Sequence, residues 1–353
     1  MSFPWNDRIP QYCSIINEIS KSYKTYDIHL HPIEIVLNML DYKEVPGEEG
    51  LFTLRGGKFI RPSSKTLQSR SAIGEIITIM KHRPQIISMM LRRAYNHTGP
   101  RVFREYFNIL GIDRGLLLPV APAEGSIDPQ MSLTHKMFKG DARFCMAGSV
   151  PNTIRNQDVE YFLLGEMEKY HIIAVKIHPN VTGIDLNSAR GKERIECIIE
   201  ASARLDLPVI IHGGQNHLPN KKTGGYAVIA NLKEIDFDYS IPVIIAHGGA
   251  YGYSSSEVVD EVIPVLKNLM RSHKNLSIDI SGLDERNISS LLSVVEMERI
   301  LFGSDALYEN QIVMLMRLLF ALEVSKLELE NSLVQLSSKN AAKIIFKENP
   351  LKI

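Results

Sequence analysis

Eight short apolar segments recur along this chain, and stretches with helical apolar spacing separate most of them. Strands without polar alternation are typical of parallel sheets that are covered on both faces, and their alternation with helices favours βαβ units. Eight such units can close into a barrel. The sequence therefore predicts an α/β fold, a (β/α)8 or TIM barrel; an open doubly wound sheet is the alternative, but it would not easily bring the first strand beside the eighth. The predicted strands cover residues 26–31, 115–120, 143–148, 172–179, 207–212, 242–247, 276–281 and 299–305.

The length of 353 residues suits one barrel domain over residues 1–353. Residues 33–113 contain no confident strand, and helical apolar spacing recurs at 33–40 and 72–95. We therefore predict a mostly helical insertion after the first strand. Insertions of this length are usually functional lids or binding elements, so we expect part of it to cover the mouth of the barrel.

The first predicted strand carries two histidines, His29 and His31, one residue apart. Side chains at i and i+2 of a strand lie on the same face. Neutral imidazole is the commonest metal ligand in proteins. The pair thus supplies half of a tetrahedral metal site.

Four further polar residues stand at the ends of later apolar segments. Barrel enzymes carry their active sites at the carboxyl ends of the strands, so these side chains should converge with the first pair. Each one alone is more often a structural residue or a helix cap. Taken together, they indicate a metal site. The four residues are His178, His212, His247 and Asp305.

Composition narrows the class of protein. Forty basic residues balance forty acidic ones, which favours neither a nucleic acid nor an anionic membrane surface as partner. Three widely spaced cysteines fit reduced thiols, and the amino-terminal residues do not form a secretory leader. No segment reaches the roughly 18 apolar residues of a membrane span. We predict a cytoplasmic protein that acts on a small-molecule substrate.

Six motifs in order along the chain resemble one known family. They are Asp27-x-His29-x-His31-Pro32, Val175-Lys176-Ile177-His178-Pro179, Ile211-His212-Gly213-Gly214, Ala246-His247-Gly248-Gly249, Phe302-Gly303-Ser304-Asp305 and the closing helix at 340–346. The set resembles the amidohydrolase superfamily, and within it the amidohydrolase-2 branch that includes aminocarboxymuconate semialdehyde decarboxylase. The resemblance spans about residues 25 to 346.

The resemblance implies a set of roles for these residues. His29, His31, His212 and Asp305 would bind one divalent metal, with Zn²⁺ preferred over Mn²⁺ or another transition metal. His247 and Asp305 would be catalytic, His247 as a general acid or base beside the reacting group. The resemblance also fits a homodimer. Three further residues are candidates to line the substrate pocket: His178, His217 and Tyr251.

Lys176 raises a second metal-site hypothesis, because some members of the superfamily bridge two metals with a carbamylated lysine on the fourth strand. Here Lys176 lies two residues before His178-Pro179, and we expect it to lie too deep for that role and to be a buried, paired lysine. A mononuclear centre is the prediction, and a binuclear one is the alternative.

Three functions are compatible with these motifs. The preferred one is metal-dependent hydrolysis of a C–N or C–O bond in a small carboxylated or cyclic substrate. A divalent metal held by histidines lowers the pKa of a bound water toward about 7 and so supplies hydroxide for this reaction. A non-oxidative decarboxylase could use the same residues. A catalytically inactive barrel that serves as a binding or scaffold protein is the third, and the retention of every predicted ligand argues against it.

Overall fold

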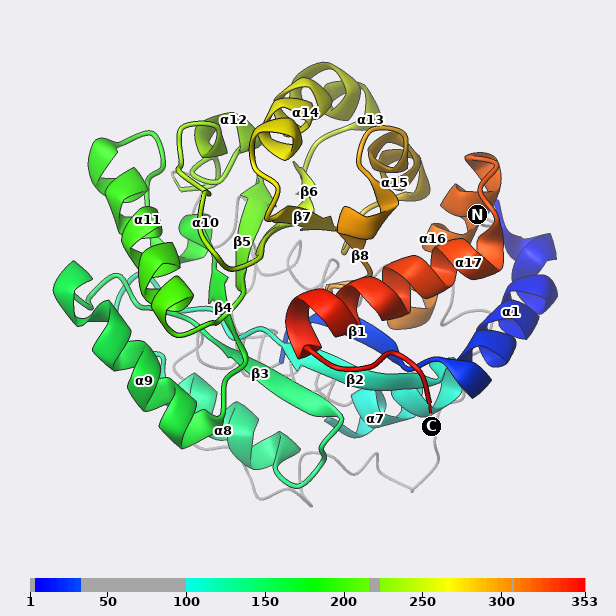
Figure 1. Cartoon of the computed structure of the whole chain (residues 1–353), viewed down its shortest axis with the longest axis horizontal. Helices are drawn as coiled ribbons and strands as arrows, with labels where there is room; N and C mark the ends of the chain where they lie inside the picture. The colour runs from blue at the N-terminus through cyan, green and yellow to red at the C-terminus, as the bar shows by residue number, and fades with distance from the viewer. Residues whose placement is uncertain (1–3, 33–99, 216–222, 307, 353) are drawn as a thin grey trace, which may run out of the picture.

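Eight parallel strands form the centre of the protein, in the order β1 to β8 (Figure 1). The structure is a computed structural model, and it describes residues 4–32, 100–215, 223–306 and 308–352. The strands are β1 (Thr25–Leu30), β2 (Ile112–Leu117), β3 (Phe144–Gly148), β4 (Ala174–Ile177), β5 (Val209–Gly214), β6 (Val243–Tyr251), β7 (Leu276–Asp279) and β8 (Ile300–Leu301). The predicted (β/α)8 barrel is confirmed.

Helices lie outside the strands and connect them. Those described are α1 (Ile9–Ser22), α7 (Pro100–Leu110), α8 (Asp128–Phe138), α9 (Val159–Tyr170), α10 (Pro179–Thr182), α11 (Ala189–Arg204), α12 (Ile229–Leu232), α13 (Ser255–Glu257), α14 (Ile263–Ser272), α15 (Glu285–Leu292), α16 (Gln311–Val324) and α17 (Leu329–Val334). A π-helical segment, Val258–Val262, joins α13 to α14. Among the described helices, none is long and apolar enough to cross a membrane.

The first and last strands meet through backbone hydrogen bonds. The amide of Ile28 donates to the carbonyl of Phe302 at 3.2 Å, and that of His31 donates to the carbonyl of Ala306 at 2.8 Å. The buried carboxylate of Asp27 adds to this seam, because it accepts from the amide of Ser304 at 2.9 Å and from the side chain of Gln311 at 2.9 Å. Regular strand structure in β8 covers only two residues, fewer than the seven predicted at 299–305.

Two hydrophobic layers hold the barrel together. One lies between the strands and the surrounding helices, and the other fills the barrel with residues such as Ile28, Ile210 and Ile244. The carboxyl-terminal helical segment, formed by Gln335–Lys339 and Ala342–Phe346, packs against the inner layer, where Phe346 stacks on Tyr26 with ring centroids 4.7 Å apart. Figure 1 shows this segment lying across the barrel near β1. Since Tyr26 stands near the start of β1, the packed end of the barrel is opposite the strand ends that carry the predicted site.

Candidate metal centre

Strand β1 brings the two paired histidines together. The Nε2 atoms of His29 and His31 are 3.2 Å apart, as the spacing of the motif predicts. The strand register is irregular between Asp27 and Leu30, and β1 ends before His31, so a local bend as well as simple alternation brings the rings together. Both side chains are almost completely buried. They form one side of the candidate metal centre.

Asp305 reaches this pair from the segment after β8. Its Oδ1 lies 3.3 Å from Nε2 of His31 and 3.7 Å from Nε2 of His29. The backbone φ of Asp305 is +61°, an uncommon value for a residue with a side chain, and its amide donates to the carbonyl of His29 at 2.8 Å. Gly303 permits this approach, since a Cβ there would stand 2.6 Å from Cβ of His29. The close contact of the last segment with β1 therefore positions the carboxylate.

The three ligand atoms have the spacing that a divalent cation needs. With bonds of about 2.1 Å, a tetrahedral ion holds its ligand atoms about 3.4 Å apart. The observed separations of 3.2, 3.3 and 3.7 Å bracket this value. The residues present therefore fit a metal ion.

Hydrogen bonds at the far side of each ring fix which nitrogen faces the centre. Nδ1 of His29 lies 2.8 Å from Oδ2 of Asp279, and Nδ1 of His31 lies 2.9 Å from the carbonyl of Leu118. Because both of these oxygens can only accept, each Nδ1 carries the proton, and Nε2 keeps its lone pair. Ligating histidines are oriented in this way in most metal sites.

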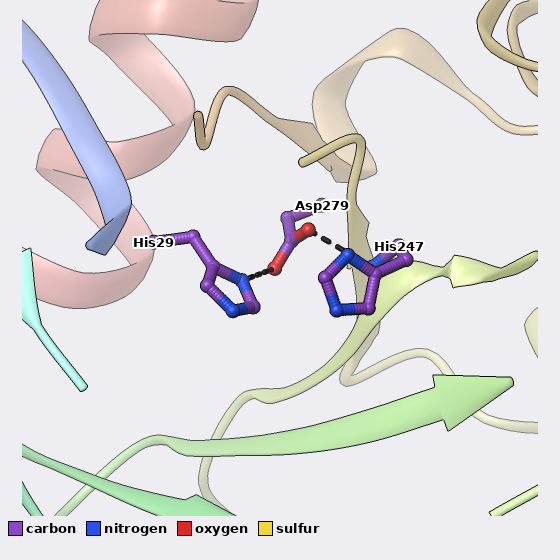
Figure 2. A group of neighbouring side chains, drawn as sticks. All are labelled: His29, His247 and Asp279. Atoms are coloured by element: carbon purple, nitrogen blue, oxygen red, sulfur yellow. Dashed lines mark hydrogen bonds and ion pairs between the residues drawn. The ribbon is translucent and has the colours of Figure 1, made fainter. Parts of the chain in front are cut away.

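Asp279, at the end of β7, connects two of the histidines (Figure 2). Its Oδ2 accepts from His29, and its Oδ1 accepts from the backbone amide of His247 at 2.9 Å and from that of Ser281 at 3.0 Å. Burial alone would raise the pKa of this carboxyl group. The electrostatic attraction and hydrogen bond of the His29 ring, with further help from His247 and Ser281, outweigh burial and hold the pKa below its ordinary value.

Sequence reasoning missed Asp279, although a signal was present. An acidic residue inside the apolar segment 276–281 is unusual for a buried strand, and its alternation with Ile278, which packs in the outer layer, places it on the barrel interior.

His247 stands beside this group, in the middle of β6. Its φ of +57° turns the side chain to the interior directly after Ala246, which also packs inside. Nδ1 of His247 donates to the carbonyl of Ser281 at 2.7 Å, so Nε2 carries the lone pair. The ring lies 4.9 Å from that of His29, centroid to centroid. Burial lowers the pKa of His247 to about 4, so the ring is a neutral proton acceptor near pH 7.

His212 lies next to the centre but outside the close group of ligand atoms that His29, His31 and Asp305 form. The ligand atoms of His29, His31 and Asp305 lie within 4.8 Å of one another, and no such described group includes His212. Its ring packs edge-on to His247, with centroids 5.0 Å apart. Its buried Nε2 has no hydrogen-bond partner within the described ranges. A polar atom left unpaired in this way is available to a ligand.

Two of the three candidate pocket residues also lie here. The ring of His178 stacks on that of His212, with centroids 3.9 Å apart and planes inclined by 10°. Tyr251 packs against the rings of His212 and His247, with centroids 5.5 and 4.8 Å away. His217 lies outside the described residues, as do residues 33–99 of the predicted insertion.

Lys176 is a buried, paired lysine as expected, but it does not lie too deep to reach the centre. Its side chain is completely buried, and its Nζ lies 3.2 Å from Nε2 of His29. The expectation about its depth failed because a lysine side chain is long enough to extend from the middle of β4 to the strand ends. Burial lowers the pKa of Lys176 to about 8, a shift that the carboxylates of Asp279 and Asp305 oppose.

The electrostatic state of the centre suits a cation. Burial lowers the pKa of His29 to about 4 and that of His31 to about 3, and Lys176 adds to both shifts. Burial also lowers the pKa of His212 and raises that of Asp305. The imidazoles are therefore uncharged near neutral pH and need not lose protons in order to bind a metal.

Comparison with known proteins agrees with this geometry. The amidohydrolase family model of the amidohydrolase-2 type matches residues 139–353. The chain belongs to the amidohydrolase family. This is a family of metal-dependent enzymes. No curated protein sequence matches this amidohydrolase significantly.

Solved structures share the fold at low sequence identity. One is 5-carboxyvanillate decarboxylase from Sphingomonas paucimobilis, with a TM-score of 0.55 and 12% identity over 92% of this chain and 99% of that one. Another is dihydroxybenzoic acid decarboxylase from Polaromonas sp. JS666, with bound manganese and the inhibitor 2-nitroresorcinol. Its TM-score is 0.55 and its identity 12%, over 91% of this chain and 96% of that one. A third is 4-oxalomesaconate hydratase from Rhodopseudomonas palustris, with a TM-score of 0.52 and 16% identity over 92% of this chain and 96% of that one. All three are similar to this amidohydrolase in fold.

Proposed function

We propose that this amidohydrolase is a metal-dependent hydrolase that cleaves a C–N or C–O bond in a small carboxylated or cyclic substrate. One divalent cation, Zn²⁺ or Mn²⁺, would be held by His29, His31 and Asp305, with His212 as the fourth ligand. The observation that carries the proposal is the convergence of Nε2 lone pairs and a carboxylate with the spacing of a metal site. A cation there supplies Lewis acidity and lowers the pKa of a bound water.

His247 would act as the general base. Hydrolysis needs a group that takes a proton from the attacking water, and His247 offers a neutral Nε2 whose partner nitrogen is fixed by the carbonyl of Ser281. Asp305 would orient the water through the carboxylate oxygen that does not face the histidines. Tyr251 and His178 would exclude bulk water on the side of β4 to β6, since both are largely buried or packed against His212. We also propose that residues 1–353 act as one barrel unit.

A non-oxidative decarboxylase is the second candidate. The observation that favours it is the similarity in fold to two solved decarboxylases, one of them with bound manganese. In that reaction a carboxylic acid substrate loses carbon dioxide, and a protein group must deliver a proton to the carbon that is left. Lys176 is suited to donate a proton, because its amine lies 3.2 Å from His29 inside the same centre.

Two measurements test the proposal. The first is the metal content of the purified protein, with His29→Ala as the variant that should lose metal. Content below about 0.2 equivalents in the wild-type protein, with no uptake on reconstitution, would favour a binding or scaffold protein instead. The second is a panel of lactones, amides and aromatic or enoic acids incubated in ¹⁸O-labelled water. A hydrolase places the label in its carboxylate product. Release of carbon dioxide with solvent proton uptake at carbon, and no turnover of lactones or amides, would identify a decarboxylase.

A further inference from the structure

A cavity lies away from the metal centre, among the loops that follow β3 and α10 and the start of α11. Its volume is about 590 Å³. None of its lining residues belongs to the metal centre, so its role is separate from the proposed reaction. Figure 1 shows α9 and α11 running side by side on the outside of the barrel. The wall includes Asn152, Asn156, Asp185, Arg155, Arg190 and Arg194.

Positive charge dominates this wall, with three guanidinium groups against one carboxylate. Arg155 is paired with Asp158 at 2.6 Å, and the carboxylate of Asp185 accepts from the amide of Asn187 at 3.0 Å. In the part of the chain that the structure describes, Arg190 and Arg194 form no ion pair with a carboxylate. With Arg155 paired, the two positive charges of Arg190 and Arg194 exceed the single negative charge of Asp185, so the wall is positive on balance.

Arg194 is a buried member of this group and is rigidly held. Its side chain is 5% exposed, and its two terminal nitrogens donate to Oδ1 of Asn156 at 2.8 Å and to the carbonyl of Pro151 at 2.9 Å. Its Nε has no hydrogen-bond partner among the described residues. Burial lowers the pKa of Arg194, which reflects the cost of keeping this charge away from water. Neutral hydrogen-bond partners fix the guanidinium in place without balancing its charge.

The beginning of α11 adds further positive potential. Ser188 caps this helix of 16 residues by accepting from the amide of Gly191. The amino-terminal end of a helix carries a partial positive charge and unpaired amide groups, which together favour phosphate and other anions. Gly191 lets the loop pack tightly here, since a Cβ at this position would collide with the carbonyl of Asp185. The helix end, Arg190 and Arg194 therefore border one cavity.

We propose that this cavity binds the phosphate group of a small polar molecule. Two guanidinium groups that form no ion pair among the described residues, together with a helix amino terminus, match a doubly charged anion with three free oxygens, whereas a single arginine fork would suffice for a carboxylate. The volume exceeds that of a free phosphate, and the side chain of Asn152 and the NH₂ group of Asn156, whose Oδ1 already accepts from Arg194, border the space left for the rest of the molecule.

Calorimetric titration of the full chain with inorganic phosphate at pH 7.5 tests this proposal. We expect saturable binding that Arg190→Gln and Arg194→Gln each weaken by about tenfold or more. Arg190 is exposed, so its variant should fold even if the buried Arg194 variant does not. The matched control is Arg204→Gln, which removes a guanidinium from the other end of the same helix and should leave phosphate affinity unchanged.

Three outcomes would overturn the proposal. One is the absence of saturable binding up to roughly 10 mM phosphate, which corresponds to a negligible affinity. Another is equal phosphate affinity in the wild-type protein and Arg190→Gln, which would place the anion elsewhere, for instance at the metal centre. The third is acetate binding as tightly as phosphate with the same dependence on Arg190, which would identify a carboxylate site.

Discussion

Substituting Asp279 by Asn should weaken metal binding without removing any proposed ligand. The two side chains have the same shape, so the change is confined to charge and hydrogen bonding. Oδ1 of Asp279 accepts from two backbone amides, those of His247 and Ser281, and from the hydroxyl of Ser281. The amide oxygen of an asparagine must occupy this position to satisfy those donors. Its NH₂ group must therefore face Nδ1 of His29.

This arrangement reverses the tautomer of His29. An NH₂ group can only donate, so Nδ1 would have to accept, and the ring proton would move to Nε2, the atom that faces the metal. Loss of such a supporting hydrogen bond typically costs 10- to 100-fold in metal affinity, or about 1.4 to 2.7 kcal/mol. We expect this loss in Asp279→Asn, together with a small change in unfolding temperature.

The assay is competition for Zn²⁺ with a chromophoric chelator, followed by thermal unfolding of the metal-free protein. Asp113→Asn is the matched control, because Asp113 also accepts from a backbone amide, that of Thr25 at 2.9 Å, but lies away from the site near the start of β2. The reasoning is refuted if Asp279→Asn, correctly folded, binds Zn²⁺ within about threefold of the wild-type protein.

Three further changes probe other features. His247→Asn can preserve the hydrogen bond made by Nδ1 but removes Nε2, so metal content should stay constant while turnover of an identified substrate falls by roughly 10² to 10⁴. Burial, with the charge of Asp128, raises the pKa of Glu166 to about 7. The folded state then holds this proton more tightly than the unfolded chain, so the stability of the fold should decrease as pH rises from about 4.5 to 7 and stay level above pH 7. In denaturant unfolding at pH 8, Glu166→Gln should be more stable than the wild-type protein by roughly 1 to 2 kcal/mol. Gly303→Ala places a Cβ 2.6 Å from Cβ of His29, so it should weaken metal binding and destabilise the fold by about 1 to 3 kcal/mol in the same two assays.

Matched controls separate these effects from general damage. Glu168→Gln changes an exposed residue on the same helix as Glu166 and should leave the pH profile of stability unaltered. Gly165→Ala adds a Cβ that meets no atom within 4 Å and should not destabilise. Metal loss in His247→Asn would make His247 a ligand, and a flat stability difference between pH 5 and 8 for Glu166→Gln would contradict its raised pKa.

The sequence by itself determined the barrel and the strand ends that carry the site. Apolar segments of strand length alternating with helices leave few other architectures, and barrel closure brings His29 near Asp305 although they are far apart in the chain. Chain order was sufficient for this, because parallel strands align their carboxyl ends at one face. The helices α15 and α16 were not foreseen, and neither was the short regular part of β8, since those boundaries depend on packing against β1 and the surrounding helices.

Tertiary structure decided how the side chains of the site are arranged. Strict alternation of side chains along a strand would not direct His247 inward directly after Ala246. The left-handed backbone conformation of His247 does this, and Asp305 has the same conformation in the segment after β8. The protonated nitrogen of each ring depends on acceptors supplied by other strands, of which Asp279 is the clearest case. The reach of Lys176 depends on the distance across the barrel interior. A sequence contains the order of residues along a strand, but these properties arise from distances between strands, which exist only once the barrel has closed.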